Sequence, residues 1–377
     1  MTTPFEEMQK NYQQRDLAAR EWKDKGGKVV GYFCDNVPEE LILAAGFFPF
    51  RLSGDPWGGT DQADEYRLTY PQVGFVDSML NMLLKGRYDF LDYLIIPHAK
   101  DQIYRLYQIL HNVRELDPDL KLPEIYFYDN LHTPFYSSGL YNRDRTFELK
   151  DQLEEWSGNE ITDESISRAI AIGNENKRLL KEVAALRSAE PSRISGVEAL
   201  QIIGPSMFML KEDHNKLLKD YLEGAEQLPA RDGARIFVEG SPLDNLQLYE
   251  IIESLDATVV ADDHCWGNRY SDVPVVKSPD PLEALVDRYH KKSPCPRMFP
   301  VSRRIDYCVK SALDAKAQGV IFYIYENDAQ AWEVPDEVKE LEAKGIPTIS
   351  FKMQQYLISE PEELKSNIED FIKEVMS

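Results

Sequence analysis

Residues 31–51 of this chain, GYFCDNVPEELILAAGFFPFR, decide its fold. The short apolar run at 28–33 predicts a buried strand. Pro38 suits the first turn of a helix, and the carboxylates of Glu39 and Glu40 complement the positive helix N-terminus. The stretch therefore predicts one strand, one loop and one buried helix.

A thiol, a carboxylate and an amide follow the predicted strand directly, in Cys34, Asp35 and Asn36. Open α/β sheets bind ligands at the carboxyl ends of their strands, so we expect these three candidate catalytic residues on the floor of a cleft. Cys34 could lie beside a metal cluster, act as a nucleophile or touch a substrate. Equally, it could be a small apolar residue that closes the strand, because free cysteine is among the most buried residue types. A nucleophilic role is disfavoured because no histidine is an obvious base for it.

Length and composition exclude several classes of protein. With 377 residues, the chain is long enough for two or three domains. A net charge of −22, from 43 basic and 65 acidic residues, argues against general binding to nucleic acid or to an anionic membrane. No apolar run approaches the roughly 20 residues that span a bilayer, and the polar N-terminus is no signal or transit peptide. We therefore expect a soluble cytoplasmic protein. Its four cysteines form neither a disulfide framework nor a zinc-type spacing, and we predict no metal ligands in the chain.

The segments predict three regions. Residues 1–141 should form an N-terminal helix of some twenty residues and a first α/β lobe, with strands in KVVGYFCD, LDYLIIPHAK and PEIYFYDN. Residues 142–233 carry helical periodicity and few strand signals. Residues 234–377 should form a second α/β lobe, with strands in ARIFVEG, ATVVADD, GVIFYIYEN and PTISFK. We also expect a loop-rich basic stretch at 288–304 and a helix at about 304–318. The fold class is therefore α/β: two Rossmann-like lobes with parallel sheets, separated by a helical segment.

The two lobes can be laid over each other, which predicts an internal duplication. FLDYLIIPHAKDQ matches QGVIFYIYENDAQ, and LPEIYFYDN matches IPTISFKMQ. The alternative is that any two βαβ lobes look alike at this level of detail. If the lobes face each other, their strand ends form one cleft, a default ligand site. We expect its lining to include these residues: Cys34–Asn36, 98–101, Ser241, 262–265 and 326–328.

ADDHCWGNRY holds the second group of candidate catalytic residues, Asp262, Asp263 and Cys265. Two acids, an imidazole and a thiol at one strand end are more than a turn needs, although Asp-Asp alone commonly caps a turn. A metal site from His264 and Cys265 alone would be poor, because adjacent residues rarely bind one tetrahedral ion together. We therefore expect these side chains to face the first group across the cleft.

RYHKKSPCPRMFPVSRR, residues 288–304, is basic in an acidic chain and contains no acid. Arg297, Arg303 and Arg304 are candidates for binding the phosphates of a cofactor or an acidic partner surface. A solvated basic loop is the equally plausible alternative. Cys295 could add to a site, whereas Cys308 in IDYCVKSAL suits the core.

From GYFCDNVPEELILAAGFFPFRL onwards, the chain resembles the family of 2-hydroxyacyl-CoA dehydratase and benzoyl-CoA reductase subunits. The resemblance continues through YDFLDYLIIPHAKDQ, VVADDHCWGNRY, RYHKKSPCP and GVIFYIYENDAQAWEVPDEVKELEAKGIP, and so covers nearly the whole chain. It implies two Rossmann-like lobes, pairing of related but unequal subunits, acyl-CoA substrates, and an ATP-hydrolysing iron–sulfur activator that delivers single electrons.

The resemblance also implies three cysteine ligands of a [4Fe–4S] cluster, which this chain lacks. Tyr70 in TYPQVGF, Lys100 in PHAKDQ and Asn327 in YENDAQ stand at those places. None of them replaces a thiolate as an iron ligand in the usual way. We therefore expect Lys100 to fill the space of the lost cluster, which would then be on the partner. A cluster held by Cys34, Cys265 and Cys295 would require the cleft to bring these three thiols together.

The leading hypothesis is a subunit of an ATP-dependent, radical-type acyl-CoA enzyme, paired with a cluster-bearing subunit in a heterodimer or larger complex. FKMQQYLISEPEELKSNIEDF and FMLKEDHNKLL favour the benzoyl-CoA reductase side. The alternatives are a 2-hydroxyacyl-CoA dehydratase subunit and a clusterless, non-catalytic protein that binds acyl-CoA.

Overall fold

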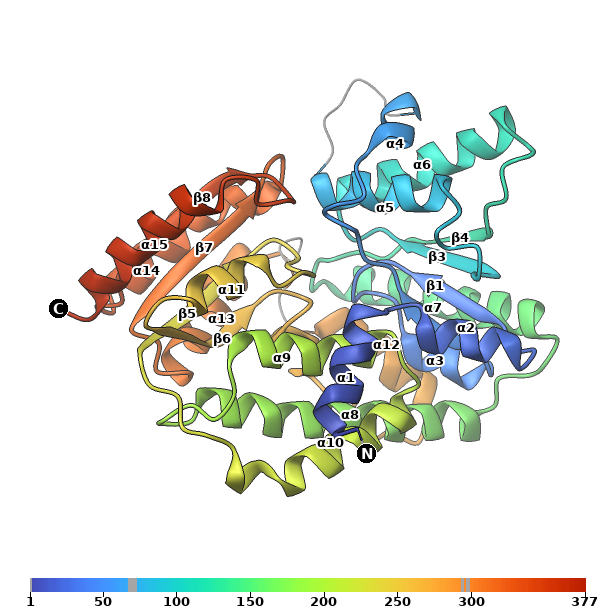
Figure 1. Ribbon diagram of the computed structural model, residues 1–377. Coiled ribbons are helices and arrows are strands. Elements are labelled where there is room, and N and C mark those ends of the chain that lie inside the picture. The colour runs from blue at the N-terminus through green and yellow to red at the C-terminus, as the bar shows by residue number, and fades with distance from the viewer. Residues whose placement is uncertain (1, 67–72, 293–294, 296–298) are drawn as a thin grey trace.

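Two four-stranded parallel sheets form two lobes of the computed structural model, which describes residues 2–66, 73–292, 295 and 299–377 (Figure 1). The first sheet has the strand order β2-β1-β3-β4: β1 (Val29–Tyr32), β2 (Phe48–Arg51), β3 (Tyr93–Pro97) and β4 (Glu124–Tyr128). The second has the order β6-β5-β7-β8: β5 (Ala234–Gly240), β6 (Ala257–Asp263), β7 (Gly319–Tyr325) and β8 (Thr348–Gln354). The α/β class with two Rossmann-like lobes is confirmed.

Both sheets share one topology, because the first strand of each lies between its second and third strands. Val30 of β1 pairs with Pro49 and Tyr93, and Ile236 of β5 pairs with Val259 and Gly319. This repeated order is what an internal duplication predicts.

The stretch that opens the first lobe contains one more element than its sequence predicted. β1 and the helix α3 (Glu39–Ala44) form as expected. The helix does not continue to the end of the buried segment, because Phe48–Arg51 forms a strand, β2. Gly46 has φ +82°, a left-handed conformation that suits glycine and turns the chain after the helix. The apolar run after Gly46 therefore pairs with β1.

The N-terminal helix is also two helices rather than one, α1 (Pro4–Gln13) and α2 (Leu17–Asp24). Gln14, the residue after α1, leaves the helical conformation with φ −113° and ψ 67°. Thr3 and Glu6 form a capping box at the start of α1. The other helices of the first lobe are α4 (Asp61–Tyr66), α5 (Gly74–Leu84) and α6 (Asp101–Leu116).

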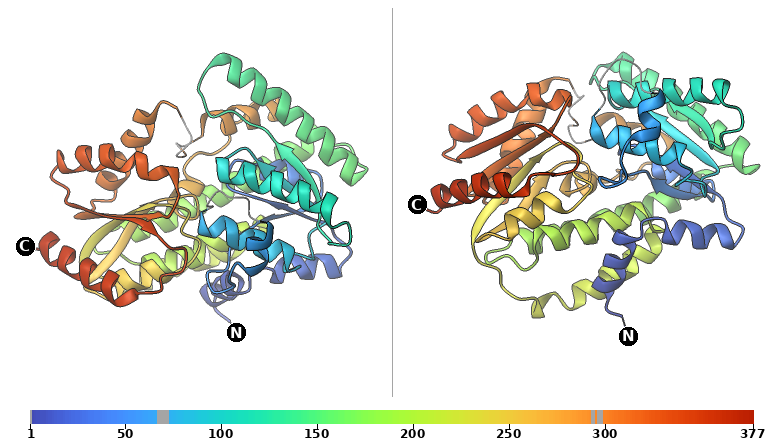
Figure 2. Two further views of the ribbon diagram at one scale, coloured as in Figure 1. Left: turned by 90° about the horizontal axis from the view of Figure 1, so that it is seen from above. Right: turned by 45° about the horizontal axis from the view of Figure 1, so that its top comes forward.

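Long helices join the two lobes. The middle of the chain forms α7 (Tyr136–Ser157), α8 (Asp163–Ser188), α9 (Gly196–Ile203), η1 (Gly204–Met207), α10 (Lys211–Glu223) and η2 (Ala225–Gln227). Figures 1 and 2 show α8 beneath both lobes, and it contacts α3 of the first lobe and β6 of the second. The relative placement of the lobes therefore depends on this helix.

The second lobe contains the remaining helices. They are α11 (Gln247–Glu253), η3 (Asn268–Ser271), α12 (Pro281–Lys291), α13 (Val301–Asp314), η4 (Ala329–Trp332), α14 (Val334–Glu342) and α15 (Pro361–Val375). The basic stretch at 288–304 begins and ends within helices, because Arg288 lies in α12, and Arg303 and Arg304 lie in α13. The helix that the sequence predicts at about 304–318 is α13, which begins three residues earlier. None of the helices in the described part of the chain is long and apolar enough to cross a membrane.

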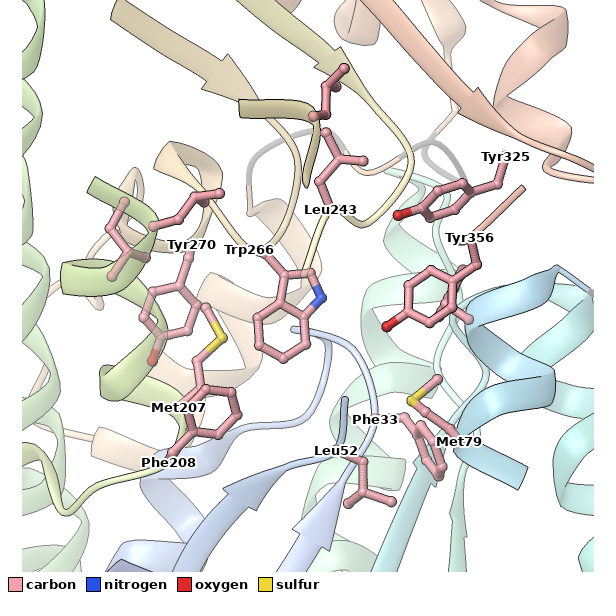
Figure 3. Close-up of a cluster of buried hydrophobic side chains, with 14 of the residues drawn as sticks. Phe33, Leu52, Met79, Met207, Phe208, Leu243, Trp266, Tyr270, Tyr325 and Tyr356 are labelled. Atoms are coloured by element: carbon pink, nitrogen blue, oxygen red, sulfur yellow. The ribbon is translucent and has the colours of Figure 1, made fainter. Parts of the chain in front are cut away.

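A continuous apolar core joins the lobes around Trp266, which follows β6. Figure 3 shows the Trp266 indole among side chains of both lobes and of the helical segment. Its ring centroid lies 5.8 Å from that of Phe208, and the Arg51 guanidinium lies 4.1 Å above it. The strand ends of the two lobes are thus packed together by buried aromatic and apolar contacts.

Candidate functional site

A small cavity lies where the strand ends of the two lobes meet. Its volume is about 30 Å³, and it is lined by Cys34, Asp35, Asn36, Phe75, Ala99, Lys100, Gly240, Pro242, Cys265, Arg269, Cys295 and Gln330. The structure thus brings together five candidate residues from the sequence, namely Cys34, Asp35, Asn36, Lys100 and Cys265. At this volume the cavity holds only one or two water molecules.

An ion pair between the lobes closes one side of this cavity. Lys100 follows β3, Asp328 follows β7, and the Lys100 Nζ lies 2.9 Å from each carboxylate oxygen of Asp328. The Ser241 hydroxyl also donates to Asp328, at 2.8 Å. Burial lowers the pKa of Lys100, but Asp328 outweighs it and the net pKa is raised. Burial raises the pKa of Asp328, yet Lys100 brings the net pKa below its ordinary value. Both groups are therefore charged near neutral pH.

A second ion pair fixes the loop after β1. Asp35 lies 2.7 Å from the Nζ of Lys292, which is buried at the end of α12. Burial raises the pKa of the Asp35 carboxyl, but Lys292 and then Arg51 outweigh burial and hold the net pKa well below its usual range. Asp35 is thus an ionised group at the cavity wall, and a segment of the second half of the chain neutralises it.

Three of the four cysteines line the cavity, from three separate segments. Cys265 accepts a hydrogen bond from the Arg51 guanidinium at 2.8 Å, and the carbonyl oxygen of Cys265 accepts another at 2.7 Å. Cys34 has φ +58°, a conformation that non-glycine residues rarely adopt and that is typical of functional sites. Burial, and then Cys265, raise the pKa of the Cys34 thiol, which is therefore protonated at neutral pH.

Asp262 and Asp263 lie behind the cavity and do not line it. Asp262 accepts from the buried Arg187 at 2.6 Å and from the Tyr249 hydroxyl at 2.9 Å. Burial raises the pKa of Asp262, but Arg187 outweighs it and the net pKa falls to about 2. Asp263 is bonded to Arg304. These carboxylates order the loop after β6. Because neither of them lines the cavity, a direct catalytic role for Asp262 or Asp263 stays a prediction that no contact in the structure supports.

The three basic candidates differ in position. Arg304 is fully buried and forms ion pairs with Glu239 and Asp263, so it cannot contact a phosphate group unless these ion pairs break. Arg303 is half-buried in the first turn of α13. Arg297 lies outside the described residues, as does Tyr70. Binding of phosphate by Arg303 or Arg297 stays a prediction.

The described residues do not fit the [4Fe–4S] cluster that the resemblance implies. No group of three or more His, Cys, Asp or Glu side chains in the described part of the chain could hold a metal ion. Cys34, Cys265 and Cys295 line one cavity, but they do not form such a group. At the strand ends of β3 and β7, the Lys100 ammonium and the Asp328 carboxylate bind each other instead.

A larger pocket of about 430 Å³ shares no lining residue with the strand-end cavity. It is lined by the end of α1, by residues 53–57 after β2 and by the start of α11, with Trp57 exposed at 67 %. The Arg15 side chain lies over the Tyr12 ring there, at 4.9 Å. Of the two hollows, only this one has room for a sizeable part of a small molecule.

Several residues at the strand-end cavity were not singled out from the sequence. Arg51 of β2 and Lys292, which follows α12, contact the cavity residues Cys265 and Asp35, and Gln330 of η4 lines the cavity itself. Arg51 is a charged residue at the end of an apolar run, and this feature of the sequence could have indicated a functional residue. Gln330 carried no signal, because its place depends on the packing of η4.

The sequence is similar to those of several known enzyme subunits. The family model for the 2-hydroxyglutaryl-CoA dehydratase, D-component, matches residues 34–375. The chain is 29 % identical to a benzoyl-CoA reductase subunit of Thauera aromatica, over 89 % of this chain and 88 % of that protein. It is 24 % identical to the (R)-phenyllactyl-CoA dehydratase beta subunit of Clostridium sporogenes (86 % of each chain), and 25 % identical to the beta subunit of the (R)-2-hydroxyglutaryl-CoA dehydratase of Acidaminococcus fermentans (93 % of each chain).

Proposed function

Because this chain belongs to the 2-hydroxyglutaryl-CoA dehydratase, D-component, family, we propose that it is a subunit of an ATP-dependent, radical-type acyl-CoA enzyme. It works beside a related, cluster-bearing subunit and an ATP-hydrolysing iron–sulfur activator. The partner supplies the [4Fe–4S] cluster, and this chain supplies a closed cavity and the surfaces that hold the complex together.

The Lys100–Asp328 ion pair carries this proposal. The resemblance gives the place of Lys100 to a cysteine ligand, and the place next to Asp328 to another. An ammonium group bound by both carboxylate oxygens at 2.9 Å fills that space and repels a metal cation. The pair therefore supports a subunit whose two lobes are joined by an ion pair at the positions where the resemblance implies ligands of an iron–sulfur cluster.

We favour ring reduction of an aromatic CoA thioester over dehydration. The similarity to a benzoyl-CoA reductase subunit supports this choice, and the similarities to two dehydratase beta subunits support the alternative. An iron-free chain that binds acyl-CoA in its 430 Å³ pocket without any turnover is the remaining alternative.

The first experiment is an assay of iron and acid-labile sulfide in the chain alone, purified without oxygen. We expect no iron. About four irons per chain would contradict the clusterless subunit. The chain is then added to a cysteine-bearing partner and the activator, with ATP and either benzoyl-CoA or an (R)-2-hydroxyacyl-CoA. Activity that requires this chain identifies the subunit role, and the reacting substrate identifies the class.

Two matched variants test whether the cavity takes part in that activity. Asp35→Asn removes the buried partner of Lys292, whereas Asp314→Asn removes the exposed partner of Lys310. We expect Asp35→Asn to lower kcat/KM of the complex about tenfold or more, and Asp314→Asn to leave it unchanged. Equal activity of the two variants would exclude the cavity from the reaction.

A further inference from the structure

Four carboxyl groups converge on one guanidinium behind the wall of the strand-end cavity. Arg304 of α13 donates hydrogen bonds to Glu239, at the end of β5, and to Asp263, at the end of β6. Its Nε lies 3.7 Å from Glu333, and one of its terminal nitrogens lies 3.6 Å from Glu337 of α14. The four carboxyl groups and Arg304 are called the acid cluster below.

The acid cluster has more carboxyl groups than cations. Arg269 is the second guanidinium at the cluster, with its Nε 3.0 Å from Asp263. Among the residues that the structure describes, four ionised carboxylates against two guanidiniums would leave two uncompensated negative charges in the interior. Lys100 does not compensate them, because it is paired with Asp328. Uncompensated buried charge is so costly that at least one carboxyl group must keep its proton.

The hydrogen-bond partners lead to the same conclusion. Both carboxyl oxygens of Glu337 and the Oε2 of Glu239 are buried and have no hydrogen-bond partner among the described residues. An ionised carboxylate accepts several hydrogen bonds, whereas a protonated carboxyl group accepts fewer. The surroundings of Glu337 and Glu239 therefore suit the neutral acid.

The cluster titrates in the physiological range. Burial raises the pKa of Glu333 and of Glu337, and although Arg304 opposes this, both pKa values reach about 7. Burial, and then Glu337, raise the pKa of Glu239 well above its ordinary value. Two weaker acids of α13 also interact with the cluster, the Tyr307 hydroxyl with Asp263 and the Cys308 thiol with Glu337 and Arg304. Burial raises the pKa of both groups well above their ordinary values, so they stay neutral.

The cluster reaches solvent at one end and the cavity at the other. The Glu333 side chain is 11 % exposed, whereas those of Glu337 and Glu239 are fully buried. Gln330 lines the cavity, and its Nε2 donates to the Oε1 of Glu239. The Gln330 backbone N–H also donates to Asp328, at 3.1 Å. The carboxyl groups around Arg304 thus include one that solvent reaches, Glu333, and one that is hydrogen-bonded to a residue of the cavity wall, Glu239.

We propose that Glu239, Glu333 and Glu337 form a proton-storage site beside the strand-end cavity, filled from solvent through Glu333, that supplies protons to the reaction of the complex. The second half of this proposal rests on the proposed function. Reduction of an aromatic ring consumes two electrons and two protons, forms two C–H bonds and removes one ring double bond. The electrons come from the ATP-dependent donor, and the protons must come from the protein. Dehydration takes both the hydroxide and the proton from the substrate, so it needs no net proton supply. A proton store therefore fits the reductive reaction.

The storage site is tested on the isolated chain by infrared spectroscopy. We expect an absorption of protonated carboxyl groups at pH 7. Glu239→Gln should diminish this absorption, and Glu337→Gln should reduce the amplitude of its titration near pH 7, because only Glu333 then titrates there. The exposed Glu342→Gln serves as the control and leaves the absorption unchanged. If Glu239→Gln does not fold, Glu337→Gln still decides, because its oxygens accept no hydrogen bonds from the described residues. Absence of the absorption at pH 7 would overturn the proposal.

The supply of protons is tested in the reconstituted complex. We expect Glu337→Gln to lower kcat of ring reduction about tenfold or more, with KM unchanged and a displaced pH profile. A wild-type complex without any activity would overturn the proposed function. The infrared measurement on the isolated chain would then still decide whether the carboxyl groups store protons. An active complex in which Glu337→Gln retains the wild-type rate and pH profile would overturn the supply of protons.

Discussion

The Lys100 Nζ lies 2.9 Å from both carboxylate oxygens of Asp328, a residue 228 positions further along the chain. The two residues follow β3 and β7, the corresponding third strands of the two lobes. Both side chains are nearly inaccessible to water. This single buried pair therefore joins the lobes at equivalent positions.

Removal of the cation should destabilise the chain strongly. We expect Lys100→Met to lower the free energy of unfolding by about 3 to 5 kcal/mol, because the charge of Asp328 is then buried without a neutralising cation. The double variant Lys100→Met/Asp328→Leu should regain most of this loss. Urea unfolding measures both, with the exposed Lys310→Met as the control. A loss below about 1 kcal/mol in the single variant would mean that the pair does not hold the lobes together.

Asp262 should act as a structural anion. Its folded pKa of about 2 lies below the unfolded value, so its ion pair with Arg187 stabilises the fold above pH 4. This contribution, about 2 to 3 kcal/mol, is lost as the pH falls toward 2. We expect Asp262→Asn to be destabilised at pH 7 and to approach the wild type near pH 2. Thermal unfolding over this range measures the difference, and a difference independent of pH would contradict the prediction.

Two buried histidines should destabilise the fold in acid. Burial lowers the pKa of His264 to about 4 and that of His214 to about 3, below the unfolded value of 6.5. The unfolded chain therefore binds protons first, and each histidine costs about 2 kcal/mol of stability by pH 5. Glu333 and Glu337 oppose this trend, because their raised pKa values add stability as the pH falls from 7.

Variants separate these opposing contributions. His264→Gln and His214→Gln should each be less stable than the wild type at pH 7.5, and this gap should shrink by about 2 kcal/mol at pH 5. Urea unfolding at both pH values provides the measurement. Replacement of the exposed His111 by Gln is the control. A gap that is equal at the two pH values would refute the buried, neutral state.

Gly240 should tolerate no side chain. A Cβ at this position would lie 2.2 Å from the backbone oxygen of Tyr323, on the adjacent strand β7. Since neither backbone can yield without breaking the pairing of β5 and β7, we expect Gly240→Ala to cost about 2 kcal/mol or more. Gly224→Ala, whose Cβ would meet only ordinary contacts, is the control. Comparable stability of the two variants by urea unfolding would contradict the tight approach of the strands.

Much of the strand-end chemistry could be predicted, but its pairing could not. Cys34, Asp35 and Lys100 each follow an apolar run of strand length, and the rule that parallel strands end at one edge placed them together. Asp262 and Arg304 were equally conspicuous in the sequence, yet they face away from the cavity toward partners on other elements. A sequence pattern locates the end of a strand, but it does not locate the partner of a charge.

The sequence by itself determined the two α/β lobes, the helical segment and the family, because apolar periodicity and local motifs are encoded within short stretches. The resemblance also predicted that Lys100 and Asn327 stand where the family pattern has thiolates. Only the tertiary structure decided that Lys100 binds Asp328, and that Glu239, Glu333 and Glu337 share Arg304. These contacts join residues about 30 to 230 positions apart, and their energies depend on burial, which only the packed interior creates.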